Sequence, residues 1–249
     1  MTLFRHELRY QLLLYTRSKE LAFFTFMLPI ILFVLLGSTY GQDTINGVRG
    51  SDFLEAGMLG YGVVSTAFAG LAIFMVIRRE SGILKRVRST PLPPWAYITA
   101  VLSSTLLAYV LNSLTIIALG RGLFSVPFPQ RWLSLIVLLF LGALAFAAMG
   151  LGLTVVVKSA EGSSATVNAI YLPMAFVSGA FFSPHAFPQF LRILADLLPL
   201  TYFIRATRDV MLHDHGVWQN WTDIAVVVAW GALGAFVALT RFRWEPAEG

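Results

Sequence analysis

The amino-acid sequence predicts an all-α membrane protein with six transmembrane helices, an N-terminal amphipathic interfacial helix, and short outer re-entrant helices between spans five and six. Composition is the first reason: hydrophobic residues make up 57% of the chain and charged residues 12%, whereas soluble domains contain about 45–50% and 25%. The second reason is that the apolar residues gather in long runs. An α-helix of roughly 20 apolar residues crosses a bilayer and satisfies its own backbone hydrogen bonds.

Six apolar runs account for most of the chain. The polar stretches between them are too short for a soluble domain, so residues 1–249 are expected to form one transmembrane domain. The first run follows a long polar and charged stretch and is expected to be a retained span rather than a cleaved signal peptide. In chain order the runs cover residues 21–37, 53–77, 95–119, 132–157, 164–182 and 222–240.

The net charge of +5 is distributed as a topology signal. Twelve of the 18 Lys and Arg residues lie in the N-terminus, in residues 78–94, in the loop 158–163 and in the C-terminal tail. Short loops rich in Lys and Arg stay on the cytoplasmic side. We therefore expect a multi-pass protein of the cell (plasma or inner) membrane with both termini in the cytoplasm, in contact with membrane lipid and without a nucleic-acid partner.

Residues 1–18 are predicted to form an amphipathic helix in the cytoplasmic interface. The alternative is a frayed basic tail. Arg5 and Arg9 lie away from the apolar face, which consists at helical spacing of Phe4, Leu8, Leu12 and Tyr15.

Small residues four apart in spans two, four and six allow close helix–helix approach. Examples are Ala148 with Gly152, and Gly234 with Ala238. They indicate either packing within one bundle or a seam between two chains.

Residues 178–214 are too polar and too rich in proline to span, yet too apolar for a free loop. Two short helices are predicted there, over 187–197 and 201–212, and they are expected to dip into the outer leaflet. Trp218 and Trp221 then mark the membrane interface before span six. Span five contains Pro173, which predicts a kink or a break.

The sequence contains no residue set typical of catalysis or metal binding. There is no cysteine and no phosphate-binding G-x-x-x-x-G-K-[ST] loop, and the three residues His213 to His215 cannot complete a metal site alone. The middle portions of the six runs lack ionisable residues; Glu55 and Asp223 are expected at span ends, where water reaches them. The polar residues that could line a pathway, or instead form interhelical hydrogen bonds, are Asn112, Thr115 and Asn168.

The densest polar stretch is the cytoplasmic segment 78–94. Read as a helix, it has an apolar ridge of Ile83, Leu84 and Val87 flanked by cations, and prolines end it before span three. Such a short amphipathic helix could fit a partner's groove. The alternative is a basic loop that only sets topology.

Two motifs resemble those of type-2 ABC exporter permeases. The first is R-R-E-x-G-I-L-K-R-V-R-x-T-P-L-P-x-W-A-Y, from Arg78 to Tyr97, which resembles the segment between spans two and three of that family. The second is S-G-A-F-F-S-P…F-P…L-P-L-T-Y…R-A-T-R, from Ser178 to Arg208, which is similar to the family's outer re-entrant region. The resemblance covers essentially the whole chain; position 83 is Ile where the pattern often has Thr.

The resemblance implies an assembly of two permeases, identical or similar, with two copies of a cytoplasmic ABC ATPase subunit. This chain is then a non-catalytic subunit that binds no cofactor, and ATP and Mg are bound by the partner. The positions implied in coupling to the ATPase are Arg79, Glu80, Gly82, Leu84, Lys85, Arg86, Arg88 and Pro91. Those implied in the outer re-entrant region are Gly179, Pro184, Pro188, Pro199, Arg205 and Arg208.

The expected function is that of an ATP-driven exporter permease, which moves a hydrophobic drug-like molecule or a lipid out of the cytoplasm or the inner leaflet. A polysaccharide or glycolipid exporter permease is the alternative within the family. A membrane-embedded enzyme acting on lipid or glycan, with Asp196, Asp209 and His185 near its outer face, is an alternative of another class. A secondary carrier is a third, against which the uncharged span interiors argue.

Overall fold

The computed structural model describes residues 2–17, 23–157 and 159–245. Residues 21 and 22 of the first predicted run, and Lys19 and Lys158 among the basic residues, lie outside the described part of the chain. The long helical elements are α1 (Thr2–Arg17), η1 (Phe23–Met27) leading into α3 (Leu28–Tyr40), α4 (Gly50–Val63), η2 (Val64–Gly70), α5 (Leu71–Glu80), α7 (Pro94–Phe124), α8 (Trp132–Leu153), α9 (Ala160–Val177) and α12 (Trp221–Arg241).

The predicted all-α membrane class is confirmed. Four helical stretches of the described residues are long and apolar enough to cross a membrane: Gly50–Glu80, Pro94–Phe124, Trp132–Leu153 and Val217–Arg241. They correspond to the second, third, fourth and sixth apolar runs. The first run forms a shorter apolar helix, Thr25–Tyr40, and the fifth forms α9, whose first half is rich in serine. Six spans therefore stay a prediction.

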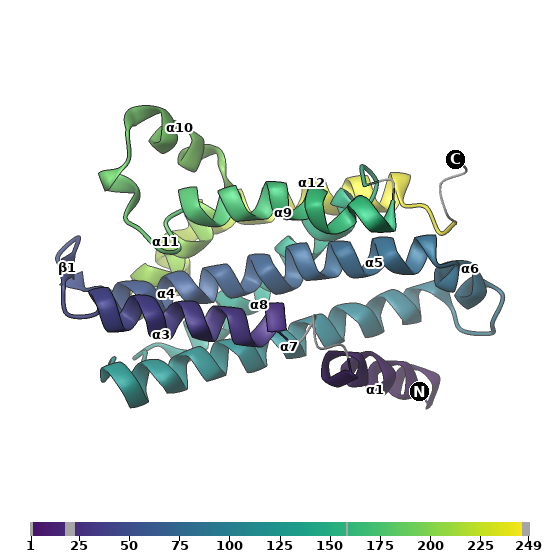
Figure 1. Ribbon diagram of the computed structural model, residues 1–249, viewed down its shortest axis with the longest axis horizontal. Coiled ribbons are helices and arrows are strands. Elements are labelled where there is room, and N and C mark those ends of the chain that lie inside the picture. Colours follow the sequence, from purple (N-terminus) through teal and green to yellow (C-terminus); the bar gives the residue numbers. More distant parts are fainter. Residues whose placement is uncertain (1, 18–22, 158, 246–249) are drawn as a thin grey trace.

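The long helices lie side by side along the longest axis of the molecule (Figure 1). The short helix α6 (Ile83–Arg88), the N-terminal helix α1 and the C-terminal end of α12 gather at one end (Figure 1). Strand β1 (Thr44–Ile45) and the helix α10 (Gln189–Leu197) lie at the opposite end. The two polar segments singled out in the sequence thus lie at opposite ends, segment 78–94 with α6 and segment 178–214 with α10.

The loop before span two forms a small antiparallel hairpin that the sequence did not predict. Strand β1 (Thr44–Ile45) pairs with β2 (Val48–Arg49). The turn residues Asn46 and Gly47 have φ angles of 52° and 81°, and Asn-Gly is the dipeptide most favoured where both central residues of a hairpin turn need positive φ.

The two short helices predicted between spans five and six are present as α10 and α11 (Pro199–Leu212), after the turn η3 (Pro184–Ala186) and before η4 (Val217–Asn220). Proline opens η3 and α11, where its missing N–H has no helical partner to lose. Helix α9 continues through Pro173 and ends at Val177, so the proline does not break it.

Helix α11 is packed inside the bundle rather than on its surface. Phe203 and Ile204 are fully buried. A Cβ placed at Gly142 of α8 would lie 2.1 Å from the Phe203 ring, and one at Gly60 of α4 would lie 2.3 Å from the Ile204 side chain. Glycine at these two positions therefore leaves the space that lets α11 pack closely against α4 and α8.

The small residues of spans four and six pack within the chain. A Cβ at Gly231 of α12 would lie 2.7 Å from the Ala145 side chain, and one at Gly152 of α8 would lie 2.8 Å from the Gly234 carbonyl. This close approach supports packing within one bundle. On its outer side α12 leaves Phe236 65% and Leu239 88% exposed, as expected for a helix that faces lipid.

Two carboxylates expected in contact with water are buried instead. Glu55 is 1% exposed, because its side chain faces α7 at Gly120, where the missing side chain leaves room for it. Asp223 is 7% exposed and lies 3.6 Å from a guanidinium nitrogen of Arg205. The expectation was wrong because the position of a residue along a span does not reveal which helix its side chain faces.

Candidate functional site

The corner between α5 and α6 lies at the end of the molecule that carries both termini (Figure 1). Helix α5 ends where the Ser81 amide donates to the Ile77 carbonyl and the Gly82 amide donates to the Arg79 carbonyl, at 2.9 and 3.0 Å. Gly82 has a φ angle of 71°, in the left-handed region that side chains with a Cβ disfavour. The corner therefore ends α5 at Glu80 and lets α6 begin at Ile83, with Gly82 in the left-handed conformation between them.

Replacing Gly82 with valine is expected to destabilise the corner by about 1–2 kcal/mol, because a β-branched residue resists positive φ. Asparagine, which tolerates this region, is the matched replacement and should lose much less. Nothing lies within 4 Å of a Cβ placed at Gly82, so crowding does not contribute. Thermal unfolding of the purified variants measures the difference, and equal losses for both would contradict the backbone explanation.

Arg79 connects this corner to the end of α8. Its guanidinium donates to the Thr154 carbonyl at 2.8 Å and to the Val157 carbonyl at 2.6 Å, and its Nε lies 2.9 Å from Glu80 Oε1. Thr154 directly follows α8, at the helix end where carbonyls lack amide partners and a cation is favourable, and Val157 lies three residues further on. Arg79 is 4% exposed, so it caps α8 from inside the protein.

Arg78 connects the same corner to α7 and α1. Its guanidinium donates to the Tyr97 hydroxyl at 2.6 Å and lies 4.2 Å from the centre of the Phe74 ring. The Tyr10 ring of α1 is 5.6 Å away. These are cation–π distances, which stabilise a desolvated guanidinium. Arg78 is buried. Its charge is compensated there by the aromatic rings and by the Tyr97 hydroxyl.

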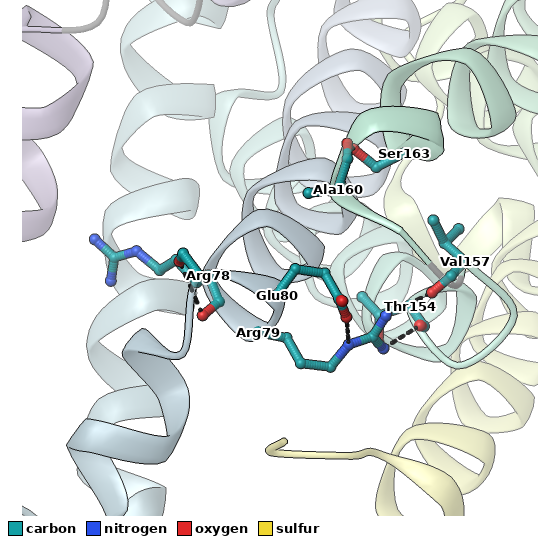
Figure 2. Close-up of polar contacts among 8 residues, drawn as sticks. Arg78, Arg79, Glu80, Thr154, Val157, Ala160 and Ser163 are labelled. Carbon is teal, nitrogen blue, oxygen red and sulfur yellow. Dashed lines mark hydrogen bonds and ion pairs between the residues drawn. The ribbon is translucent and has the colours of Figure 1, made fainter. Parts of the chain in front are cut away.

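The two adjacent arginines point in opposite directions, Arg78 away from the α8–α9 connection and Arg79 with Glu80 into it (Figure 2). Near this connection the Ser163 hydroxyl donates to the Ala160 carbonyl within α9. The end of α5 is thereby tied to α1 and α7 on one side and to the end of α8 on the other. A displacement of the corner would strain both sets of contacts.

Helix α6 is anchored mainly by Leu84, and Val87 packs partly against the core. Leu84 is fully buried, whereas Ile83 is 36% exposed and Val87 is half-buried. The cations Lys85, Arg86 and Arg88 are exposed and take part in no ion pair among the described residues. The ridge expected from the sequence is therefore split: Leu84 fixes α6 to the bundle, and the exposed part carries three positive charges.

The structure distributes the predicted coupling residues between the interior and the surface. Arg79 and Leu84 are buried, Glu80 and Gly82 are partly exposed, and Lys85, Arg86, Arg88 and Pro91 are exposed. The sequence reasoning missed Arg78 as a packing residue, together with its partner Tyr97 and the two carbonyl groups that receive Arg79. Tyr97 closes the sequence motif, which was the one signal that could have suggested its role.

Of the three candidate pathway residues, Asn112 is fully buried and donates to the Thr25 carbonyl at 2.8 Å. Its Oδ1 faces Gly62 and has no hydrogen-bond partner among the described residues. Thr115 bonds to the Leu111 carbonyl within α7, and Asn168 lies partly exposed on α9. In this single chain Asn112 thus joins two helices, while Asn168 lies on a surface.

The predicted outer residues lie together at the opposite end of the molecule. Gly179 has a φ angle of 89°, and its carbonyl accepts a hydrogen bond from Arg208. Arg205 lies 3.7 Å from Asp196 and 3.6 Å from Asp223. The prolines stand at helix starts: Pro184 begins η3, Pro188 precedes α10 and Pro199 begins α11.

The enzyme alternative has little support in the side-chain arrangement. His185, Asp196 and Asp209 line one cavity at this end of the molecule. However, Asp196 is paired with Arg205, and Asp209 lies 3.2 Å from His213. No group of three or more His, Cys, Asp or Glu residues in the described part of the chain could hold a metal ion.

Comparison with known proteins gives consistent results. A family model described as ABC-2 type transporter matches residues 2–212. YvfS of Bacillus subtilis (strain 168), provisionally named a transport permease, is 23% identical over 229 residues, which are 91% of this chain and 90% of YvfS. The inner membrane transport permease YadH of Escherichia coli (strain K12) is 24% identical over 204 residues, 82% of this chain and 75% of YadH. The daunorubicin resistance ABC transporter permease protein DrrB1 of Streptomyces coeruleorubidus is 27% identical over 186 residues, 72% of this chain and 62% of DrrB1.

Proposed function

Because the chain belongs to the ABC-2 type transporter family, we propose that it is the non-catalytic permease subunit of an ATP-driven exporter. The observation that carries this proposal is the α5–α6 corner. A basic helix projects from the bundle, and the corner behind it is tied through Arg78 and Arg79 to helices on both sides. A partner that pushes on α6 would therefore act on α1, α7 and α8 together.

The free energy for transport must come from a partner. The middle portions of the spans carry no ionisable residues, which ion-coupled carriers normally place there. The sequence also has no phosphate-binding loop. We therefore propose two copies of a separate cytoplasmic ATPase that bind ATP and Mg, together with a second permease that is identical or similar.

The orientation we propose follows from the basic residues. Helices α1 and α6 and the C-terminal end of α12 gather at the same end (Figure 1), and Lys and Arg are concentrated there. Short loops rich in these residues remain cytoplasmic. Both termini then face the cytoplasm, which requires an even number of spans. The six-span topology adds the helices of the first and fifth runs, and α10 and α11 become the outer re-entrant helices.

The substrate class we propose is a hydrophobic drug-like molecule or a lipid. The connections between the helices are short, and the described residues form no separate domain that could bind sugars outside the membrane. The name of DrrB1 refers to resistance to daunorubicin. A substrate that partitions into the bilayer can reach the helices from the lipid phase.

Charge reversal on α6 tests the proposed contact. The triple substitution Lys85→Glu, Arg86→Glu and Arg88→Glu is expected to lower co-purification of the ATPase at least about tenfold, because complementary charges become repulsive. The side chains are exposed, so folding should be retained. Arg131→Glu, an exposed cation at the other end of the molecule, is the control. Undiminished co-purification and ATP-dependent transport by the triple variant would refute the coupling assignment.

A further inference from the structure

A cavity of about 310 Å³ lies at the end of the molecule opposite α6. Helix α10 contributes Arg192 and Asp196 to its lining, and α11 contributes Arg205, Arg208 and Asp209. Two short helices of amphipathic composition thus enclose a charged space beside the apolar bundle. The coupling mechanism proposed above uses none of these side chains.

Arg208 is a cation that makes no ion pair with the described carboxylates of this cavity, although the charge of Asp209 acts on it. It donates to the Gly179 carbonyl, and its guanidinium carbon lies 3.5 Å from the centre of the Phe53 ring. Its Nε is buried without a hydrogen-bond partner, and none of the described carboxylates lies within ion-pair distance of it. Desolvation lowers the pKa of this guanidinium. Burying a charge is unfavourable unless a counter-ion compensates it, so an anion is the ligand this position favours.

The carboxylates of the cavity are already engaged. Asp196 lies 3.7 Å from Arg205, which also reaches Asp223, and Asp209 lies 3.2 Å from His213. Arg192 donates only to backbone carbonyls, those of residues 185 and 187, each at 2.7 Å. Arg192 and Arg208 are therefore the two cations of the lining that an incoming anion could neutralise.

The exposed side chains around the cavity are those typical of a membrane interface. Residues Arg192 and Asp196 of α10 face the cavity, while four apolar side chains at helical spacing are exposed. Trp218 of η4 and Trp221, the first residue of α12, are 80% and 66% exposed. Tryptophan and amphipathic helices of this kind lie at the boundary between headgroups and acyl chains. The exposed residues of α10 are Phe190 (68%), Ile193 (58%), Leu194 (43%) and Leu197 (63%).

We propose that this cavity binds the phosphate of a phospholipid headgroup from the adjacent leaflet, with Arg208 as its main contact and Arg192 as the second. A guanidinium matches the geometry of a phosphate and binds it through charge-assisted hydrogen bonds. The apolar stripe of α10 keeps the helix among the acyl chains of the same leaflet. The site goes beyond the proposed transport function and needs neither the ATPase nor a transported substrate.

Titration of the purified full-length protein in a phosphate-free detergent tests the site. The probe is dihexanoyl-phosphatidylglycerol, followed by the change in tryptophan fluorescence, and we expect saturable binding. Arg208→Gln should weaken it by at least about tenfold, since charge-assisted hydrogen bonds to phosphate are the strongest contacts that the site offers. Arg192→Gln should weaken it less. Arg131→Gln, whose side chain pairs with Asp214 outside the cavity, should bind like the unmodified protein.

Two further ligands identify the source of the anion. Dihexanoylglycerol, which has the same tails without phosphate, should not compete, and inorganic phosphate should compete only weakly. Binding by phosphate in place of the phospholipid, or equal competition by dihexanoylglycerol, would overturn the proposal. So would unchanged affinity of Arg208→Gln. If Arg208→Gln does not fold, Arg192→Gln decides, and unchanged affinity in that variant would then refute the site.

Discussion

Replacing Arg79 with methionine is expected to destabilise the protein by about 3 kcal/mol or more, because two buried carbonyls lose hydrogen bonds from a charged group, each of which contributes about 1.5–3 kcal/mol. The Thr154 and Val157 carbonyls lose their donors at the end of α8, and the Glu80 carboxylate loses its cation. Methionine keeps much of the apolar stem, so the loss reports the charge and its hydrogen bonds rather than a cavity. Unfolding by heat or by SDS measures it.

Two companion variants make the Arg79 result specific. Arg79→Lys keeps the charge but cannot present the planar fork to both carbonyls, so an intermediate loss is expected. Arg88→Met removes an exposed cation of the same corner and should stay within about 0.5 kcal/mol of the unmodified protein. Equal stability of Arg79→Met and Arg88→Met would show that the contacts with the end of α8 are not made in the membrane.

The coupling proposal adds a second expectation for the same residue. In a variant such as Arg79→Lys, which should remain folded, the ATPase is expected to bind because the exposed face of α6 is unchanged. Transport per ATP hydrolysed should fall, since the corner is less firmly tied to α8. If ATPase binding fell to the same extent as transport, Arg79 would instead be needed to keep the exposed surface of α6 in its binding arrangement.

Replacing Gly234 with alanine is expected to cost about 1–3 kcal/mol, the range observed when an atom is forced into packed structure. The new methyl carbon would lie 2.5 Å from the Met149 Cα and 2.6 Å from the Met149 nitrogen. These are backbone atoms, so the overlap is relieved only if α12 moves away from α8. The higher helix propensity of alanine, about 1 kcal/mol, offsets only part of the loss.

Gly122→Ala is the matched control for this prediction. It introduces the same methyl group into α7, where nothing lies within 4 Å of the new carbon. It should be neutral or slightly stabilising. Unfolding of both variants in one detergent checks the contrast. If Gly234→Ala instead changed only the association of two permeases, the small residues of α12 would form a seam between chains rather than an intramolecular contact.

Much of the fold followed from composition and periodicity. Each of the six apolar runs is helical over most of its described residues, because a helix satisfies its own backbone hydrogen bonds in an apolar environment; α8 and α9 end at Leu153 and Val177, a few residues before their runs do. The short helices α10 and α11 were also expected within a few residues of where they lie. Proline marked their starts, since it fits the first turn of a helix and disfavours its interior.

The candidate site was predicted only in outline. Leu84 and the cations of α6 followed from the local sequence, because residues three and four apart share one face of a helix. The different roles of Arg78 and Arg79 did not, although they are neighbours in the chain. The acceptors of Arg79 lie 75 and 78 residues further on, and no local pattern reports a contact over such a separation.

The sequence by itself determined that this is a helical membrane protein with a basic end, because transfer free energy and charge act on each segment independently. Only the tertiary structure decided which side chains meet. Glu55 and Asn112 are buried because α4 and α7 pack closely where Gly120 and Gly62 leave space. Arg208 reaches Phe53 and Gly179 because α11 lies against α4. Such contacts depend on the rotation and spacing of helices, which are set by packing among residues distant in the chain.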